Sequence, residues 1–343
     1  MSSKAITKVQ ASIVIAIIVI AVIAGAAYYV LMPAPPAKPK ELTFSSGVTG
    51  GTWAVGGASM AEIITNNVPG AKVTSIPGNP GENLIRLEDN TAQLGFTYVG
   101  FLKAGIAGGK LADVKILDKA TSNVRGILKF EIVSPMTIVI RKDIDVKTFG
   151  EIIEKKMKLR WATYQPGSNE LNLQILLKSV YGLAYSDLKT WGGSLNQAPA
   201  DQTSMLMKDG LADIYAGTLG VPTGWITEVM QTGKFKLLPV EDSAIQKMGG
   251  FGFSAATIKA GAYPGTDKDV PSFAENTCIV VRADLSNDMV YSITKTLLEE
   301  KNRKTVETAV KIFKMDPANS WKGLEGMLHP GAEKYYKEAG YMK

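Results

Sequence analysis

The chain has 343 residues, a formal net charge of +6 at pH 7, one cysteine and one histidine. A lone cysteine excludes an intrachain disulfide, and a lone histidine excludes a metal site built from several histidines. Four lysines and no acidic residue fall in the first forty positions, and the remainder is nearly balanced in charge. The basic balance therefore gives no indication of nucleic-acid binding.

The N-terminal segment contains an uninterrupted apolar stretch from Ile13 to Met32. A helix of this length spans about 30 Å at ~1.5 Å per residue, the thickness of one bilayer core. Basic residues precede the stretch, so we expect a short cytoplasmic N-terminus over residues 1–8 and a transmembrane anchor or uncleaved signal over 9–32.

A cleaved signal peptide is the other interpretation of this segment. Small residues at 24–26 offer a cleavage site, although the apolar stretch is longer than a typical signal core. Residues 33–40 are rich in proline, which favours an extended, semi-rigid spacer. We therefore expect the body of the protein on the extracytoplasmic face of the membrane, at the cell surface or in the periplasm.

The body from Glu41 onward alternates short β-type runs with amphipathic helical segments, which predicts an α/β fold with mainly parallel sheets. A β-prone run over 131–140, interrupted by Pro135, is expected where the chain passes between two lobes. The predicted division is lobe I over 41–135 plus 255–343 and lobe II over 136–254. Strands are expected over 42–46, 72–76, 94–98, 159–163, 214–216, 235–239 and 277–282, and helices over 53–65, 82–88, 145–157, 170–181, 203–209, 223–231 and 287–301.

Two glycine-containing turns, over 47–52 and 164–169, each follow a predicted strand and precede a helix. A helix N-terminus has unpaired N–H groups and partial positive charge, and glycine permits close approach by a ligand. Thr49, Thr52 and Ser168 add hydroxyl donors. The turns therefore predict a paired anion site facing a cleft. Tight turning alone is the other interpretation, and a nucleotide site lacks the required Gly-Lys-Ser/Thr.

Aromatic and arginine side chains near these turns are further candidates for ligand contact. Aromatic residues near strand ends lie more often in the core, and most arginines are expected in solvent. The aromatic candidates are Trp53, Tyr98, Trp191, Tyr215 and Tyr263, and the candidate carboxylate clamps are Arg86, Arg125, Arg141 and Arg160.

Catalysis is not expected from this sequence. His329 lies in a segment that resembles a loop opening a C-terminal helix, and no Gly-x-Ser-x-Gly nucleophile motif occurs. We therefore predict a protein that is not an enzyme and needs no cofactor.

Several segments, in one order from about Leu42 to the C-terminus, resemble the TAXI-type solute receptors of TRAP transporters. Residues 47–56 (GVTGGTWAVG) resemble that family's opening turn, and 76–84 (IPGNPGENL) its Gly-Gly-Ser-x-Glu-Asn-Leu segment. Residues 164–169 resemble its Pro-Gly-Ser-Gly-Thr turn. Further similar segments are 215–223, 260–271 and 328–332.

The resemblance implies a type II periplasmic-binding-protein fold, in which two α/β lobes close on a ligand and dock on TRAP-type membrane permease subunits. It implies a small organic acid or amino acid as ligand, of the glutamate or 2-oxoacid dicarboxylate class. The implied ligand-binding residues are Thr49, Gly50, Gly51, Thr52, Trp53, Asn83, Tyr98, Gly167, Ser168, Asn169, Tyr215, Gly217 and Thr218.

The sequence departs from the family pattern at two places. Asn79 and Pro80 replace Gly-Ser and remove a hydroxyl donor, while Asn169 and Glu170 replace Gly-Thr in the second turn. A carboxylate at Glu170 would repel an anionic ligand unless it points away or pairs with an amino group, which raises the hypothesis of an amino acid or a less acidic ligand. A ligand sensor acting through a partner membrane protein, and an anchored hydrolase, are the competing functions.

Overall fold

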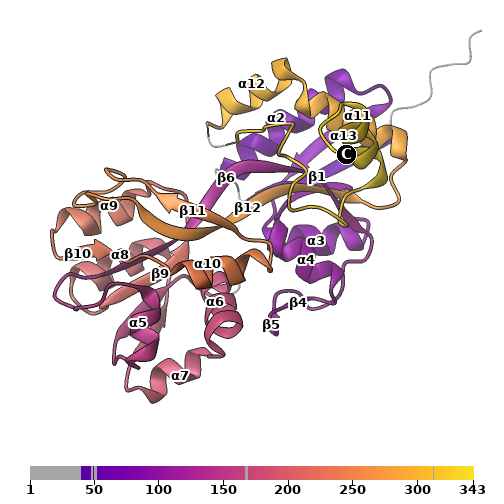
Figure 1. Cartoon of the computed structure of the whole chain (residues 1–343). Coiled ribbons are helices and arrows are strands. Elements are labelled where there is room, and N and C mark those ends of the chain that lie inside the picture. The colour runs from indigo at the N-terminus through magenta and orange to yellow at the C-terminus, as the bar shows by residue number, and fades with distance from the viewer. Residues whose placement is uncertain (1–39, 48, 50–51, 167–168, 312) are drawn as a thin grey trace, which may run out of the picture. The chain divides into compact units, whose positions relative to one another are not determined.

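The computed structural model describes residues 40–343, except 48, 50–51, 167–168 and 312. The predicted transmembrane or signal segment and most of the spacer lie outside the described residues. Among the helices of the described residues, none combines the length and apolarity needed to cross a membrane. From Glu41 to Lys343 the chain forms one unit with two α/β lobes (Figure 1).

Lobe I begins with the predicted strand-helix-strand-helix-strand pattern, which the structure confirms. The first and third strands pair in parallel, with Phe44 opposite Leu94. The strand order across this half of the sheet is β2-β1-β3-β12-β6. Its elements are β1 (Lys40–Ser45), α2 (Thr52–Asn67), β2 (Ala71–Ile76), α3 (Pro80–Glu88), β3 (Leu94–Tyr98) and α4 (Val99–Ile106), followed by the small hairpin β4 (Lys110–Leu111) and β5 (Val114–Lys115).

Two long antiparallel strands, β6 (Val124–Arg141) and β12 (Val270–Arg282), connect the lobes. Figure 1 shows them as neighbouring ribbons that lead from one lobe into the other. Near the middle, β6 changes partner: Pro135 is opposite Ala274 of β12, whereas Met136 is opposite Thr218 of β9. Proline lacks a backbone donor, so it fits the place where one ladder ends and another begins.

Lobe II repeats the alternation of strands and helices. Within it β7 pairs in parallel with β8 and β9, as expected. In contrast, β6 pairs antiparallel with β9 and β10, because the connecting strands run back and forth between the lobes. Its elements are α5 (Phe149–Glu154), β7 (Arg160–Thr163), α6 (Leu171–Tyr181), α7 (Tyr185–Thr190), β8 (Ser194–Gln197), α8 (Ala200–Lys208), β9 (Ile214–Thr218), α9 (Gly224–Gln231), β10 (Phe235–Leu237) and α10 (Asp242–Gly249).

The C-terminal part supplies β11 (Ser254–Ile258), which pairs with the first half of β12, and three helices. The single helix expected over 287–301 is divided, because Glu299 has extended backbone angles between two helices. The helices are α11 (Asn287–Leu298), α12 (Glu300–Ala309) and α13 (Pro330–Glu338).

Residues just after position 255 lie against lobe II. Ile258 and Tyr263 are buried with Tyr215 and Ile226, and the N–H of Val240 donates to the carbonyl of Pro271. The boundary at 255 stays a prediction, and these contacts argue for a later one.

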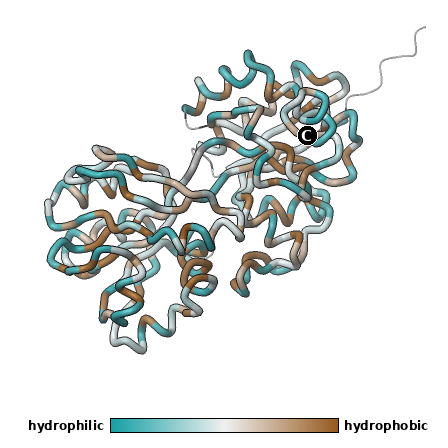
Figure 2. The backbone as a smooth tube through the Cα atoms, in the orientation of Figure 1, coloured by the Kyte–Doolittle hydropathy of each residue, from teal (hydrophilic) through white to brown (hydrophobic). Residues whose placement is uncertain are grey.

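The core of lobe I contains a cluster of aromatic rings. The Phe96 ring lies 4.9 Å from that of Phe44 and 5.3 Å from that of Phe313, and Phe313 stacks on Phe130 at 4.5 Å. Figure 2 shows hydrophobic and hydrophilic stretches alternating along the covering helices, as expected of helices with one buried face. This packing fixes β3, whose last residue, Tyr98, belongs to the candidate site.

Candidate ligand-binding site

The first glycine turn leads directly into α2. Thr49 and Thr52 are exposed, while Gly50 and Gly51 lie outside the described residues. A Cβ on Gly47 would lie 2.4 Å from the Cβ of Trp53, so position 47 has no room for a side chain beside the start of the helix.

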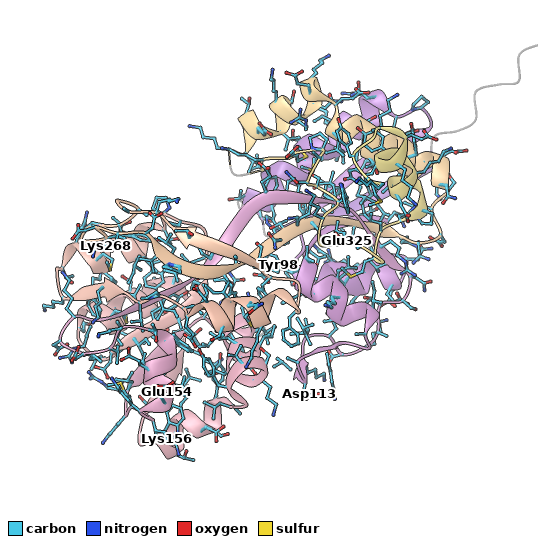
Figure 3. All side chains as sticks on the ribbon, in the orientation of Figure 1. Tyr98, Asp113, Glu154, Lys156, Lys268 and Glu325 are labelled. Carbon is cyan, nitrogen blue, oxygen red and sulfur yellow. The ribbon has the colours of Figure 1, made fainter. Side chains whose placement is uncertain are left out.

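Trp53 and Tyr98 bring the start of α2 and the end of β3 together. Their ring centroids are 5.1 Å apart, and both side chains are half-buried. Tyr98 is opposite Thr277 in β12, and Figure 3 shows it beside that strand. Burial and the nearby Glu275 carboxyl both raise the pKa of the Tyr98 phenol. Tyr98 therefore stays a protonated donor at neutral pH.

The start of α3 explains one departure from the family pattern. The Asn79 side chain accepts from the N–H of Glu82 at 3.0 Å and caps the helix, with Pro80 in its first turn. Asn83, one turn later, donates to the carbonyls of Ser46 and Phe96 at 2.8 and 2.7 Å. The Asn83 amide thus holds the turn against β3, and its role as a ligand contact stays a prediction.

The second glycine turn is held against lobe II by Asn169, whose amide donates to the carbonyl of Thr218 at 2.8 Å. Gly167 and Ser168 lie outside the described residues. The adjacent Glu170 is fully buried and accepts from Gln174 at 2.9 Å and from the hydroxyl of Tyr185 at 2.8 Å. Its carboxylate therefore points into the lobe, and the repulsion argument for a less acidic ligand loses its premise.

Of the predicted residues in β9, Tyr215 is fully buried, and its ring lies 4.8 Å from that of Trp225. A Cβ on Gly217 would come within 2.5 Å of the Tyr215 hydroxyl, so Gly217 makes room for that side chain. Tyr215 and Gly217 thus serve the interior of lobe II in this structure, and direct contact of either with ligand stays a prediction.

Thr218 ends β9 and belongs to a buried polar cluster with Asn172 of α6 and Glu275 of β12. The Asn172 amide nitrogen lies 2.6 Å from the Thr218 hydroxyl and 2.8 Å from a Glu275 oxygen, and the hydroxyl lies 3.3 Å from that same oxygen. Burial raises the pKa of Glu275 to about 8, against the opposing hydrogen bonds from Asn172 and Thr218.

Sequence reasoning missed Glu275 and Asn172. The available signal was the polar pair Glu275-Asn276 inside an otherwise β-prone run. A carboxylate is rarely buried in a strand unless it has a bonding partner, because burial of an unpaired charge is costly. The structure brings together Tyr98 from lobe I, Asn169 and Thr218 from lobe II, and Glu275 from a connecting strand. Together these side chains offer hydroxyl, amide and carboxyl groups, which can bond a small polar molecule.

All four candidate arginine clamps have partners elsewhere. Arg86 bonds Ser45 at 3.0 Å and pairs with Glu82. Arg160 donates to Asp213 at 2.9 Å, an acid that Arg141 also reaches. Arg125 donates to the carbonyls of Ser122 and Val124, both at 2.8 Å.

The remaining aromatic candidates have roles in packing. The Tyr263 hydroxyl accepts from the N–H of Thr223 at 3.0 Å within lobe II, and Trp191 packs at the edge of the core. A cavity of about 690 Å³ lies near the C-terminus against Trp321 and Tyr341, and no predicted ligand residue lines it.

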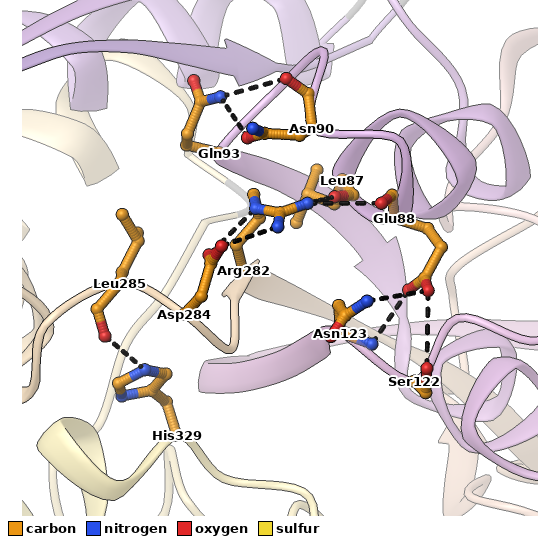
Figure 4. Close-up of polar contacts among 10 residues, drawn as sticks. All are labelled: Leu87, Glu88, Asn90, Gln93, Ser122, Asn123, Arg282, Asp284, Leu285 and His329. Carbon is orange, nitrogen blue, oxygen red and sulfur yellow. Dashed lines mark hydrogen bonds and ion pairs between the residues drawn. The ribbon is translucent and has the colours of Figure 1, made fainter.

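His329 opens α13, as its sequence setting predicts. It is fully buried; its Nδ1 accepts from the N–H of Gly331 at 3.1 Å, and its Nε2 lies 3.1 Å from the carbonyl of Leu285. Figure 4 shows the contact of His329 with Leu285 near the Arg282–Asp284 ion pair. Burial lowers the pKa of His329, in keeping with a neutral capping imidazole.

A family model described as the NMT1-like family matches residues 44–340. Among solved structures, the chain is similar to a TctC solute-binding protein from Polaromonas, with 13% identity, 90% of this chain and 99% of that chain covered, and a TM-score of 0.51. It is also similar to XAC2383 from Xanthomonas citri bound to ATP, with 11% identity, 87% and 98% coverage, and a TM-score of 0.50.

These matches confirm the predicted type II periplasmic-binding-protein fold with two α/β lobes. The Polaromonas protein is described as a solute-binding protein, a class of protein that holds a ligand without transforming it. The prediction that the chain is not an enzyme is therefore confirmed as well.

Proposed function

The chain belongs to the NMT1-like family, and from that premise we propose that it is the extracytoplasmic receptor of a secondary transporter of the TRAP type. The observation that carries the proposal is the convergence of Tyr98, Thr218 and Glu275 from two lobes and a connecting strand. A ligand that contacts side chains of both lobes binds the closed form more tightly, so ligand binding favours closure.

The TAXI subtype rests on the order of the resembling segments along the chain. The turn that begins at Gly47 leads into α2, and the turn over 164–169 precedes α6, as that subtype requires. The ligand would be a small organic acid or amino acid, with its anionic end at these two helix N-termini.

Membrane attachment and the partner follow from the same proposal. The apolar stretch Ile13–Met32 would anchor the protein, and the proline-rich segment over 33–40 would hold the body away from the bilayer. TRAP-type permease subunits are the proposed partners, and the closed lobes would present the loaded ligand to them.

Identification of a bound small molecule tests the receptor function directly. We expect native mass spectrometry of the purified protein to show a ligand of low molecular mass, and titration calorimetry with that compound to give one site. Pull-down from membranes of the source cell should recover a multi-spanning permease. Recovery of a histidine kinase instead would favour a sensor, and turnover of the bound compound would contradict a receptor.

A further inference from the structure

The buried cluster at the connecting strands has acceptors that its own members leave unused. Within the part of the chain that the structure describes, Glu275 Oε1 and Asn172 Oδ1 have no hydrogen-bond partner, although both atoms are inaccessible to solvent. Both side chains are almost completely buried, with 3% of Glu275 and 1% of Asn172 exposed. Unpaired acceptors at such depth are costly and indicate a missing donor.

The position of this pair coincides with the candidate site. Thr218, an expected ligand contact, bonds both Asn172 and Glu275. Asn172 lies in the first turn of α6, directly after the second glycine turn, and Glu275 is opposite Ser134, one residue before β6 changes partner. The two acceptors therefore lie beside the first turn of α6.

Across the described residues, the Glu275 carboxyl has no cationic partner, and a cationic hydrogen-bond donor would supply one. Glu275 forms no ion pair with a lysine or arginine of the described residues, and the ionisable side chain that faces it is Tyr98. An isolated carboxylate is disfavoured in this setting, whereas a carboxylate paired with an ammonium group would have both its charge and its free lone pairs satisfied.

We infer that Glu275 Oε1 and Asn172 Oδ1 accept hydrogen bonds from a protonated amino group of the ligand. This inference rests on the receptor function proposed above and narrows its ligand class. The ligand is a zwitterion: its carboxylate lies at the helix N-termini, and its ammonium group lies at the connecting strands. An amino acid fits this arrangement, and the 2-oxo acid with the same skeleton lacks the donor.

The competing arrangement needs no ligand. If the Asn172 amide were rotated by half a turn, its oxygen would accept from a protonated Glu275 Oε2 and from Thr218, but its nitrogen would take the unpartnered place and Glu275 Oε1 would remain unpaired. The two arrangements differ in protons: pairing with an ammonium group ionises Glu275 and releases its proton, whereas the internal bond keeps it.

Calorimetry with matched pairs of ligands tests the inference. The panel contains glutamate and 2-oxoglutarate, leucine and 4-methyl-2-oxopentanoate, and alanine and pyruvate. We expect the best amino acid to bind more tightly than its 2-oxo partner, and Glu275→Gln to weaken that amino acid by roughly 10- to 100-fold with little effect on the 2-oxo acid. Glu241→Gln is the control, because that carboxylate bonds Tyr181 at the far end of α6 and should leave both affinities unchanged.

Proton release provides a test that needs no variant. At pH 7, titration of the wild type in buffers of different ionisation enthalpy should show nearly one proton released per amino acid bound. Zero release, tighter binding of the 2-oxo acid, or an unchanged preference in Glu275→Gln would each overturn the inference while leaving the receptor intact. If neither the panel nor a co-purified compound binds, the receptor function itself fails.

Discussion

Glu275 is a carboxyl group whose proton depends on folding. Burial raises its pKa to about 8, whereas an unfolded glutamate titrates near 4.3. Below pH 4 both states are protonated and the group contributes nothing. Between about pH 4.3 and 8 the unfolded chain releases the proton and the folded chain keeps it, so this group lowers the free energy of unfolding as pH rises.

We therefore expect Glu275→Gln, which cannot ionise, to gain stability relative to wild type as pH rises from 5 to 8. The gain should reach on the order of 3 kcal/mol near pH 7. Urea unfolding of both proteins, without ligand, at several pH values measures it. Parallel curves for the two proteins would mean that Glu275 titrates normally in the folded state.

Glu170 and Glu275 are both glutamates, but their carboxyl groups differ in hydrogen bonding. Both Glu170 and Glu275 are buried, but Glu170 accepts from Gln174 and Tyr185 within its own lobe, whereas Glu275 keeps an unpaired oxygen. Sequence reasoning selected Glu170 because it lies in a recognisable turn. The residue with the unsatisfied group lies in a strand that carries no motif.

The start of α3 shows how an element can depart from a family pattern and keep its local structure. Asn79 accepts from the N–H of Glu82, and its own amide donates back to the Glu82 carboxylate at 2.9 Å. The first of these bonds satisfies an orphan backbone N–H of the first turn, and the second holds the Asn79 side chain in its capping position. The substitution that removes a hydroxyl from the expected anion site thus supplies a cap for the helix.

Replacing Asn79 by alanine should lower the free energy of unfolding by about 1 kcal/mol, because the N–H of Glu82 loses its partner. Asn79→Ser keeps a capping oxygen and should retain most of the stability. Urea titrations followed by circular dichroism compare the three proteins. Equal loss in the serine and alanine variants would contradict a capping role and point to an effect of side-chain volume.

Helices and strands with a clear apolar period were predicted close to their observed places, as β3 and β7 illustrate. Boundaries that depend on distant partners were not. The expected strand over 277–282 begins at Val270, because its first half pairs with β11 and β6 and has an irregular register near Asn276. The break at Glu299 could likewise not be predicted, because no proline or glycine lies near it in the sequence.

At the scale of the whole molecule, the two connecting strands determine how the site is assembled. β6 pairs with β12 on one side of Pro135 and with β9 on the other, so a single strand belongs to both lobes. A ligand held by Tyr98, Thr218 and Glu275 would contact both lobes and the strands between them. Closure about these strands is the expected consequence of binding.

Small-angle scattering should therefore show a smaller radius of gyration when the confirmed ligand is added at saturating concentration. The physical reason is that contacts from both lobes are made together only in the closed form. A compound from the panel that calorimetry shows not to bind is the control. An unchanged radius of gyration with a confirmed ligand would contradict lobe closure as the mechanism.

The sequence by itself determined the α/β alternation, the two glycine turns before helices and the lone cysteine and lone histidine, because periodicity, turn chemistry and residue counts are local or global properties of the chain. The tertiary structure alone decided which polar groups remain unpaired. Asn172 and Glu275 are 103 residues apart and meet only through packing. Whether a buried carboxyl has a partner depends on its burial, the charges near it and the hydrogen bonds offered to it, and no local sequence pattern encodes these.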